Sequence, residues 1–221
     1  MINAILFDLY ETLITESHYR PTRASSLAPA LGLERDAYRK EWKARRPRIV
    51  VGKLSFAEAL TEVCEGLAGS ANTTAIQDIC QQRIREKAVA YADVDDQIVT
   101  LLRELVRRNV RLGVISNGFK EDVLGWPDCS LAPLFPCTVF SCEEGVAKPD
   151  PEIYRRGLRR LGTRPETTIY IGDGGDHELA GAEEAGLRAC RAAWFVPTSP
   201  DPRPWPELKR SADVLNLVEA G

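Results

Sequence analysis

The sequence predicts an α/β fold in which a doubly wound, parallel-sheet (Rossmann-like) core carries an inserted all-helical cap. Short apolar runs rich in Val and Ile recur along the chain, at 3–8, 111–116, 137–141, 168–173 and 187–194. None of them alternates strictly between polar and apolar residues, which is typical of parallel strands covered on both faces. Three helical patterns separate the later runs, and this alternation favours right-handed crossovers within one sheet.

The helices expected in the core lie at 96–109, 151–162 and 177–186. Each pattern closes on Gly or Asn, the residues that most readily end a helix in the left-handed conformation. With the five apolar runs, these helices account for the core.

A helical block interrupts this order after the first strand. Residues 17–92 contain no credible strand, and their helical stretches lie at 37–46, 55–69 and 74–92. We read Pro47, Gly52 and the stretch 68–72 as breaks between these helices. The block is therefore predicted to be a cap domain at 17–92, inserted into a core formed by 1–16 and 93–221.

Composition excludes several classes of protein. The chain of 221 residues has a formal net charge of -3, which does not suggest the basic face that nucleic-acid phosphates require. No apolar run approaches the roughly 18 residues that cross a bilayer, and no basic-then-apolar leader is present. The six cysteines lack zinc-site spacing and are read as reduced thiols. We expect a cytoplasmic protein that binds neither nucleic acid nor a membrane.

Polar residues follow four of the predicted strands, at the edge of the sheet where ligands collect in open parallel folds. In chain order these residues are Asp8 and Thr12, then Ser116, Asn117 and Gly118, then Lys148, and finally Asp173, Asp176 and Glu178. Converging carboxylates are suited to hold Mg²⁺, a hard cation that offsets negative charge. A carboxylate nucleophile, a fixed lysine charge and hydroxyl or amide donors complete a set for a small anionic substrate.

The segments ILFDLYETL, VISNG, VAKPDPEIY and IGDGGDHELAGAEEAG occur in this order between residue 5 and residue 186. Together they resemble the four motifs of the haloacid dehalogenase-like hydrolase superfamily, in its helical-cap subfamily. The resemblance implies a covalent aspartyl intermediate and a catalytic set of Asp8 as nucleophile, Thr12, Ser116 and Lys148. It further implies substrate contacts from Tyr10, Asn117 and Gly118, and a Mg²⁺ site made by Asp8, the Tyr10 backbone carbonyl, Asp173 and Glu178.

Tyr10 departs from the pattern of the superfamily's phosphatases, which have a second aspartate two residues after the nucleophile as general acid and base. An ordinary tyrosine pKa near 10 makes it a poor proton shuttle at neutral pH, and losing such a group typically costs ~10²–10⁴ in rate. Dehalogenases of the superfamily have Tyr at this position because halide leaves without a proton. They also resemble this chain at Ser116 and at Tyr154.

The fourth segment favours a phosphatase. Metal-independent dehalogenases have a Ser-Ser-Asn-type sequence where this chain has Asp173, Gly174 and Gly175. Without a cation, Asp173 and Glu178 would repel the Asp8 carboxylate and raise its pKa. The leading interpretation is therefore a Mg²⁺-dependent phosphatase of a small phosphorylated metabolite, acting best on good leaving groups.

Two alternatives stay open. The first is a metal-independent 2-haloacid dehalogenase, for which Arg45, Arg46 and Arg48 are candidate carboxylate ligands. The second is a catalytically silent homologue that binds a phosphorylated ligand. Asp176 could share the metal site, and the cap offers a surface on which a homodimer could form.

Overall fold

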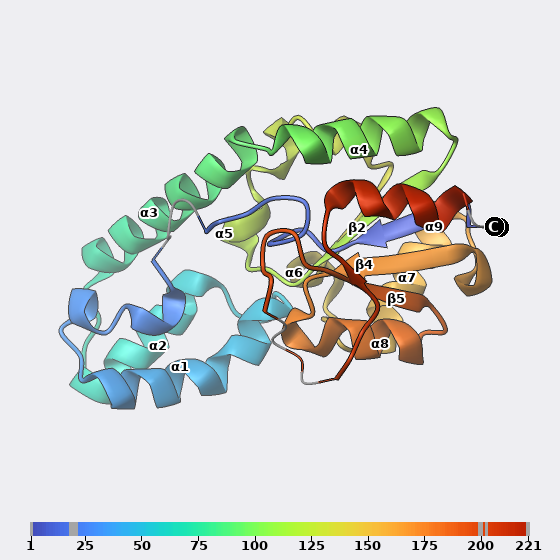
Figure 1. The fold of residues 1–221 in the computed structure, drawn as a ribbon. Helices are drawn as coiled ribbons and strands as arrows, with labels where there is room; N and C mark the ends of the chain where they lie inside the picture. The colour runs from blue at the N-terminus through green and yellow to red at the C-terminus, as the bar shows by residue number, and fades with distance from the viewer. Residues whose placement is uncertain (1, 18–21, 199–200, 202, 220–221) are drawn as a thin grey trace.

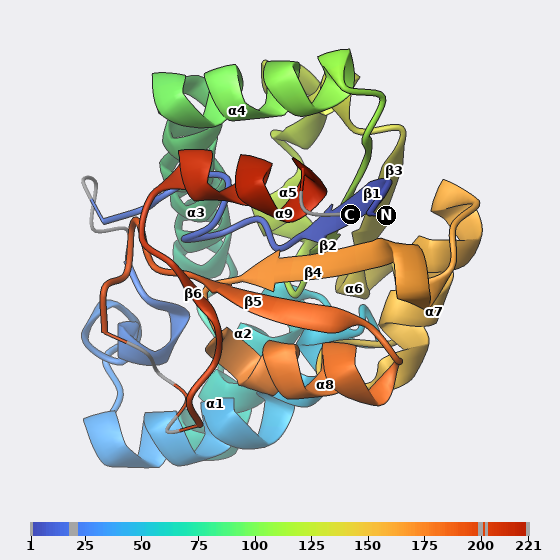
Figure 2. The ribbon, with the colours of Figure 1, turned by 45° about the vertical axis from the view of Figure 1, so that its right-hand side comes forward.

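In the computed structural model, which describes residues 2–17, 22–198, 201 and 203–219, six strands form one parallel sheet. Their order is β3-β2-β1-β4-β5-β6 (Figure 2), as in doubly wound folds. The strands are β1 Ala4–Phe7, β2 Arg111–Ser116, β3 Cys137–Phe140, β4 Thr168–Gly172, β5 Arg188–Ala192 and β6 Glu207–Leu208. The predicted fold class is confirmed.

Strand β1 lies between β2 and β4 in the middle of the sheet. Phe7, its last residue, pairs with Val114 of β2 and Ile171 of β4. The Asp8 amide then donates to the Ile171 carbonyl oxygen at 2.8 Å. Because the carboxyl ends of parallel strands meet at one edge, Asp8 is placed at the centre of that edge.

Helices cover both faces of the sheet (Figure 1). On one face lie α4 (Asp96–Arg107) and α9 (Leu215–Glu219), and on the other lie α7 (Pro151–Leu161) and α8 (Glu178–Glu184). Helix α7 illustrates how the sequence sets these bounds: the Asp150 carboxylate accepts from the Glu152 amide, Pro151 takes the first position and Gly162 ends the helix at φ 62°. Two short helices, α5 (Lys120–Val123) and α6 (Ser141–Glu144), follow β2 and β3.

The inserted cap consists of α1 (Arg35–Val50), α2 (Phe56–Ala68) and α3 (Thr73–Ala92), which lie beside the sheet in Figure 1. It has an apolar core of its own, in which Tyr38, Trp42 and Phe56 are buried and Phe119 joins from the loop after β2. The all-helical cap is confirmed. The domain boundaries at 16/17 and 92/93 stay predictions.

The structure corrects one prediction inside the cap. Pro47 does not end the first cap helix but lies within the last turn of α1, which continues to Val50. A proline removes one helical hydrogen bond, and here the following residues are held from outside the helix. Ile49 and Val50 are buried in the cap core, and the Val50 carbonyl accepts from the Ser141 hydroxyl at 2.7 Å. The chain turns at Gly52, which has φ 69°.

Short 3-10 helices connect the main elements: η1 Ala24–Ser26, η2 Pro29–Leu31, η3 Trp126–Asp128, η4 Ala132–Leu134, η5 Pro165–Thr167, η6 Gly175–His177 and η7 Ser211–Val214. Among the described residues, no helix combines the length and the apolar character needed to pass through a membrane.

Candidate active site

The carboxyl edge of the sheet brings all the predicted site residues except Thr12 and Gly118 to the lining of one pocket of about 250 Å³. Asp8 follows β1 directly, Ser116 ends β2 and Asp173 follows β4. Lys148 reaches the same pocket from the loop before α7, and Glu178 from the first residue of α8. Residues up to 170 positions apart in the sequence thus lie around one small space.

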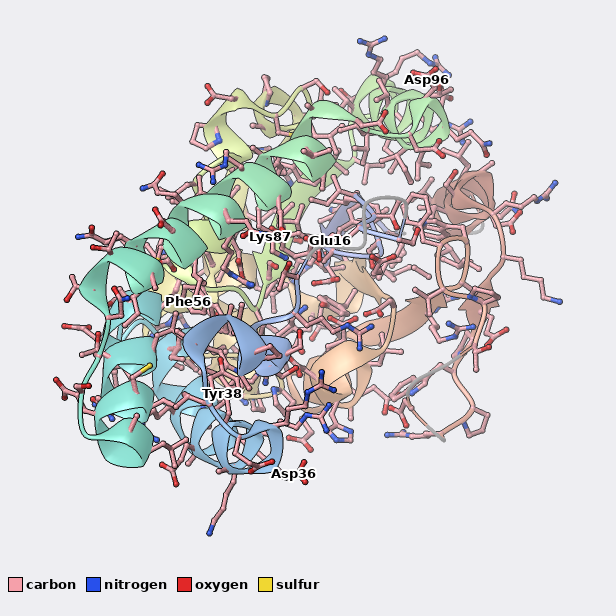
Figure 3. All side chains as sticks on the ribbon, turned by 90° about the vertical axis from the view of Figure 1, so that its left-hand side faces the viewer. Glu16, Asp36, Tyr38, Phe56, Lys87 and Asp96 are labelled. Atoms are coloured by element: carbon pink, nitrogen blue, oxygen red, sulfur yellow. The ribbon has the colours of Figure 1, made fainter. Side chains whose placement is uncertain are left out.

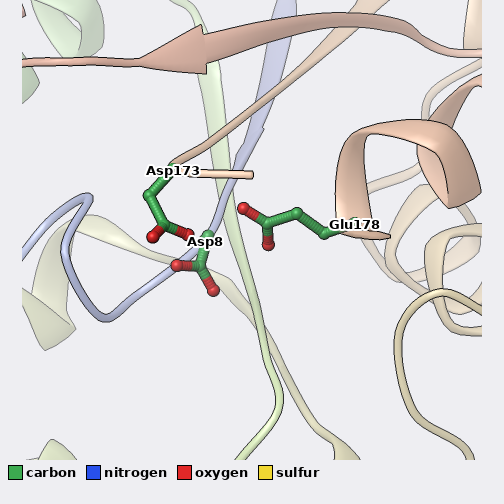
Figure 4. A group of neighbouring side chains, drawn as sticks. All are labelled: Asp8, Asp173 and Glu178. Carbon is green, nitrogen blue, oxygen red and sulfur yellow. The ribbon is translucent and has the colours of Figure 1, made fainter. Parts of the chain in front are cut away.

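Three carboxylates converge in this pocket. One oxygen each from Asp8, Asp173 and Glu178 lies within 4.8 Å of the others, and Figure 4 shows the three groups pointing toward a common space. Asp8 and Glu178 are buried, with 5% and 1% exposure. Carboxylate oxygens are the ligands that hard divalent cations take, so this group could hold a metal ion.

Lys148 carries a buried positive charge between two of these carboxylates. Its Nζ lies 2.5 Å from Asp8 Oδ1 and 2.5 Å from Glu178 Oε2. Asn117 fixes the lysine backbone, because its Oδ1 accepts from the Lys148 amide at 2.8 Å and its Nδ2 donates to the Lys148 carbonyl at 2.9 Å. The Asn117 side chain therefore positions Lys148.

Tyrosines and backbone amides hold Glu178. Tyr170 donates to Glu178 Oε2 at 2.6 Å, the Gly174 amide donates to Oε1 at 3.0 Å, and Tyr154 donates to the Glu178 backbone carbonyl at 2.7 Å. A Cβ at Gly172 would overlap the Glu178 carboxylate, so a larger residue there would displace Glu178. Tyr170 was missed by the sequence analysis, although a lone tyrosine in an apolar strand, three residues before Asp173, was an available signal.

Two carboxyl groups of the pocket, those of Asp8 and Asp173, have raised pKa values. Burial, aided by the charge of Glu178, raises the pKa of Asp8 to about 8 against the opposing effect of Lys148. Burial and Glu178 also raise the pKa of Asp173 to about 6. Burial lowers the pKa of Lys148, but the charges of Asp8 and Glu178 outweigh it, and the net pKa is above the ordinary value. The pocket holds more negative charge than one lysine offsets.

These pKa values predict how the stability of the metal-free protein depends on pH. Since the unfolded carboxyls titrate near pH 4, the fold keeps protons on Asp8 and Asp173 that the unfolded chain has lost. The free energy of unfolding should therefore fall as pH rises from about 5 to about 8. Thermal melts in chelator would show this decrease, and added Mg²⁺ should raise the melting temperature more at pH 8 than at pH 5. A flat profile, or equal shifts at both pH values, would contradict the assignment.

Two buried hydroxyls of the pocket region have no hydrogen-bond partner within the described part of the chain. They are Thr12 Oγ1 and Ser116 Oγ, with exposures of 0% and 1%. Buried polar atoms are nearly always bonded, so the Ser116 hydroxyl, which lines the pocket, is available to the oxygens of a bound ligand. The Gly118 amide, also predicted to contact substrate, already has a partner: it donates to Ser141 Oγ at 3.1 Å. Gly118 lines the neighbouring cavity.

Tyr10 borders the pocket, but its hydroxyl is bonded elsewhere. The hydroxyl donates to the Asp122 backbone carbonyl at 2.7 Å and lies 3.2 Å from the Tyr91 hydroxyl. Burial, together with nearby Tyr91 and Asp122, raises the Tyr10 pKa well above its ordinary value. The adjacent Glu11 carboxylate accepts from Thr15 Oγ1 and from the Glu16 amide. The polar ends of both side chains are thus bonded to groups outside the catalytic centre.

Asp176 connects the core to the cap. It accepts from Asn117 Nδ2 at 3.0 Å and pairs with Arg46 of α1 at 3.2 Å. These two partners lower its pKa although burial opposes them. Arg45 and Arg48, the other arginines considered as haloacid ligands, pair with Glu62. The sequence analysis missed the contact of Arg46 with Asp176.

The fold and the polar groups at its edge define a class of capped α/β hydrolases. A family model described as haloacid dehalogenase-like hydrolase matches residues 2–186. The chain therefore belongs to the haloacid dehalogenase-like hydrolase family and is a hydrolase, which confirms the resemblance in the four segments.

Curated relatives and solved structures fit this assignment. The chain is 26% identical over 229 residues to glyceraldehyde 3-phosphate phosphatase of Methanopyrus kandleri, covering 99% of this chain and 97% of that protein. It is 28% identical over 199 residues to the protein of the same name in Methanocaldococcus jannaschii (86% and 85%). A 2-haloacid dehalogenase from Pseudomonas syringae shares the fold with a TM-score of 0.70 at 21% identity (100% and 99%). CbbY of Rhodobacter sphaeroides also shares the fold, with a TM-score of 0.65 at 23% identity over 96% of both chains.

Proposed function

We propose that this protein is a Mg²⁺-dependent phosphatase that transfers the phosphoryl group of a small phosphorylated metabolite to Asp8 and then to water. The observation that carries the proposal is the convergence of Asp8, Asp173 and Glu178 beside Lys148. A dehalogenase needs no cation, whereas three clustered carboxylates, of which Asp8 and Asp173 have raised pKa values, are stabilised by one. Relatives that match nearly the whole chain are named as phosphatases.

Each residue of the pocket has a role in this proposal. One Asp8 oxygen attacks phosphorus, the bond from phosphorus to the leaving oxygen breaks, and water later hydrolyses the aspartyl phosphate to phosphate and a free carboxylate. Lys148 holds Asp8 in place and offsets substrate charge, the Ser116 hydroxyl donates to a phosphoryl oxygen, and Thr12 orients Asp8. Bound by Asp8, Asp173, Glu178 and the Tyr10 carbonyl, Mg²⁺ would supply positive charge to the phosphoryl group.

The proposal has a direct test in p-nitrophenyl phosphate hydrolysis with Mg²⁺ and with chelator, using Asp8→Asn as control. Phosphate release that needs both the metal and Asp8 supports it. Halide release from 2-chloropropionate in chelator would instead establish the dehalogenase, which the tyrosine at position 10 favours. Phosphate binding without turnover in either assay would establish the silent ligand-binding homologue.

Tyr10→Phe tests whether the tyrosine hydroxyl takes part in the reaction. We expect kcat on p-nitrophenyl phosphate to stay within about two-fold, because a hydroxyl bonded to the Asp122 carbonyl transfers no proton to the substrate. Losing that bond should lower the free energy of unfolding by about 0.5–1.5 kcal/mol. Tyr91→Phe is the matched control, since its hydroxyl donates to the same carbonyl at 2.9 Å. A loss of kcat confined to Tyr10→Phe would contradict this view.

Without a proton donor at position 10, the leaving group must depart as an anion or take its proton from solvent. Rates across a series of aryl and alkyl phosphates should therefore rise steeply as the pKa of the leaving alcohol falls. A flat dependence would show that a donor acts at the leaving oxygen. A cytoplasmic location and a homodimer are further parts of the proposal, to be tested by fractionation and by sedimentation.

A further inference from the structure

A second, larger cavity adjoins the catalytic pocket. Its volume is about 760 Å³, and α1 and α3 of the cap and the loop after β2 form its walls. Asn117 lines both this cavity and the catalytic pocket. A molecule whose phosphoryl group lies at Asp8 can therefore extend past Asn117 into the space under the cap, which we name the cap cavity.

Basic side chains dominate the wall of the cap cavity. Among the described residues its lining has six basic side chains, Arg23, Arg39, Lys43, Arg46, Arg83 and Lys87, against three acidic ones, Glu16, Glu86 and Asp122. The acidic groups are all engaged: Asp122 pairs with Arg83 at 2.7 Å, Glu16 pairs with Lys87 at 2.5 Å (Figure 3), and Glu86 accepts from Thr22. The cavity thus has an excess of positive charge.

Arg46 is paired with Asp176, so the uncompensated charge on α1 lies on Arg39 and Lys43. Arg39, Lys43 and Arg46 follow one another at helical spacing and line the same cavity. Lys43 forms no ion pair within the described residues, and the carboxylate nearest to Arg39 is that of Asp36, at 3.8 Å with both side chains largely exposed. Like charges four residues apart destabilise a helix, and a bound anion would relieve this repulsion.

Aromatic rings give the cavity a rigid side. Trp42 and Phe119 line it, with ring centroids 5.9 Å apart. The Arg83 guanidinium lies 4.8 Å from the Phe119 ring centroid and 5.2 Å from that of Phe56, and it pairs with buried Asp122. A cation held in this way needs little reorganisation to receive a ligand.

We propose that the cap cavity binds the leaving group of the substrate and that this leaving group carries an anionic group of its own, a carboxylate or a phosphate. The inference rests on the proposed phosphatase function, since it assumes that a phosphoryl group occupies the pocket at Asp8. Lys43 and Arg39 then bind the second anion through charge-assisted hydrogen bonds. They are specificity-determining residues and take no part in the chemical step.

Three aryl phosphates with similar leaving-group acidity test this proposal: 4-ethylphenyl, 4-(carboxymethyl)phenyl and 4-(phosphonomethyl)phenyl phosphate. We expect kcat/KM to be about ten-fold higher for at least one of the two anionic compounds, the combined effect of exposed charge pairs with Lys43 and Arg39 that contribute about two- to five-fold each. The preferred compound of the two shows whether the leaving group carries a carboxylate or a phosphate. Equal values for all three compounds would overturn the inference.

Variants on α1 identify the groups responsible. The preference is measured as kcat/KM for the anionic compound divided by kcat/KM for the 4-ethylphenyl compound. Lys43→Gln and Arg39→Gln should each lower this ratio by about two- to five-fold, as expected for partly exposed charge pairs. Lys40→Gln is the matched control, because Lys40 is exposed on the same helix and does not line the cavity. An equal decrease in the control would attribute the effect to net charge and contradict the assignment.

Binding measurements separate a failure of this inference from a failure of the proposed function. The three compounds are titrated calorimetrically into the Asp8→Asn protein with Mg²⁺, and into the wild type if it does not turn them over. Tighter binding of an anionic compound that Lys43→Gln weakens would support the inference even without hydrolysis. Hydrolysis of all three with no difference in binding would overturn it and leave the phosphatase function intact.

Discussion

Lys148→Met is expected to lower the free energy of unfolding of the metal-free protein by about 3–5 kcal/mol at pH 8, the usual cost of leaving buried charges without a partner. The Lys148 ammonium is the cation that contacts both Asp8 and Glu178, and all three side chains are buried. The destabilisation should be smaller at pH 5, because Asp8, whose pKa is about 8, then keeps its proton and needs no counter-charge. Urea unfolding at the two pH values measures the difference.

The same substitution should lower kcat/KM on p-nitrophenyl phosphate by about 10³-fold or more even with saturating Mg²⁺. Without Lys148, the pKa of Asp8 rises further and less of the nucleophile is ionised at neutral pH. Lys209→Met is the matched control, because Lys209 is exposed and does not line the catalytic pocket. Exposed ion pairs contribute about 0–1 kcal/mol. If the free energy of unfolding of Lys148→Met at pH 8 were within about 1 kcal/mol of the wild-type value, Lys148 would be no more stabilising than a surface lysine. That result would contradict the buried network described above.

Asp8→Asn should reduce kcat by at least about 10³-fold, because removing a covalent nucleophile leaves only binding and electrostatic contributions. An amide does not form the aspartyl phosphate, so acid-quenched wild-type protein should contain an acyl phosphate that the variant lacks. The measurement is phosphate release in Mg²⁺ combined with mass spectrometry of the quenched protein. Activity within ten-fold of the wild type would remove Asp8 from the role of nucleophile.

The stability of Asp8→Asn should distinguish a catalytic from a structural defect. The wild-type carboxyl has a pKa of about 8 because burial and Glu178 oppose its ionisation. Removing that charge should leave the metal-free variant as stable as the wild type or more stable at pH 8, and the gain should vanish at pH 5. Lys148 keeps Glu178 as a partner in the variant. A melting temperature clearly below that of the wild type at pH 8 would show that Asp8 stabilises the fold.

Local sequence patterns were sufficient to predict five of the six strands, most helix ends and the group of polar residues at the sheet edge, whereas the two-residue edge strand β6 was not predicted. A strand covered on both faces requires a short run of apolar residues, and parallel pairing brings the ends of such runs to one edge. Asp8, Ser116, Lys148 and Asp173 could therefore be placed together before their contacts were known. The breaks predicted at Gly52 and 68–72 are confirmed. They too depend on local conformation, because Gly52 and Gly69 have positive φ angles that favour glycine.

The directions and partners of these side chains depend on packing between segments far apart in the chain. Tyr10 follows Asp8 by two residues, yet its hydroxyl is bonded to Asp122, 112 residues later, and no local periodicity carries that information. Arg46 reaches Asp176 only because the cap is docked against the core. Pro47 stays helical for a related reason: contacts of Val50 with the core hold a turn that proline propensity alone would end. Propensity and periodicity act over a few residues, whereas the site is assembled by the docking of whole elements.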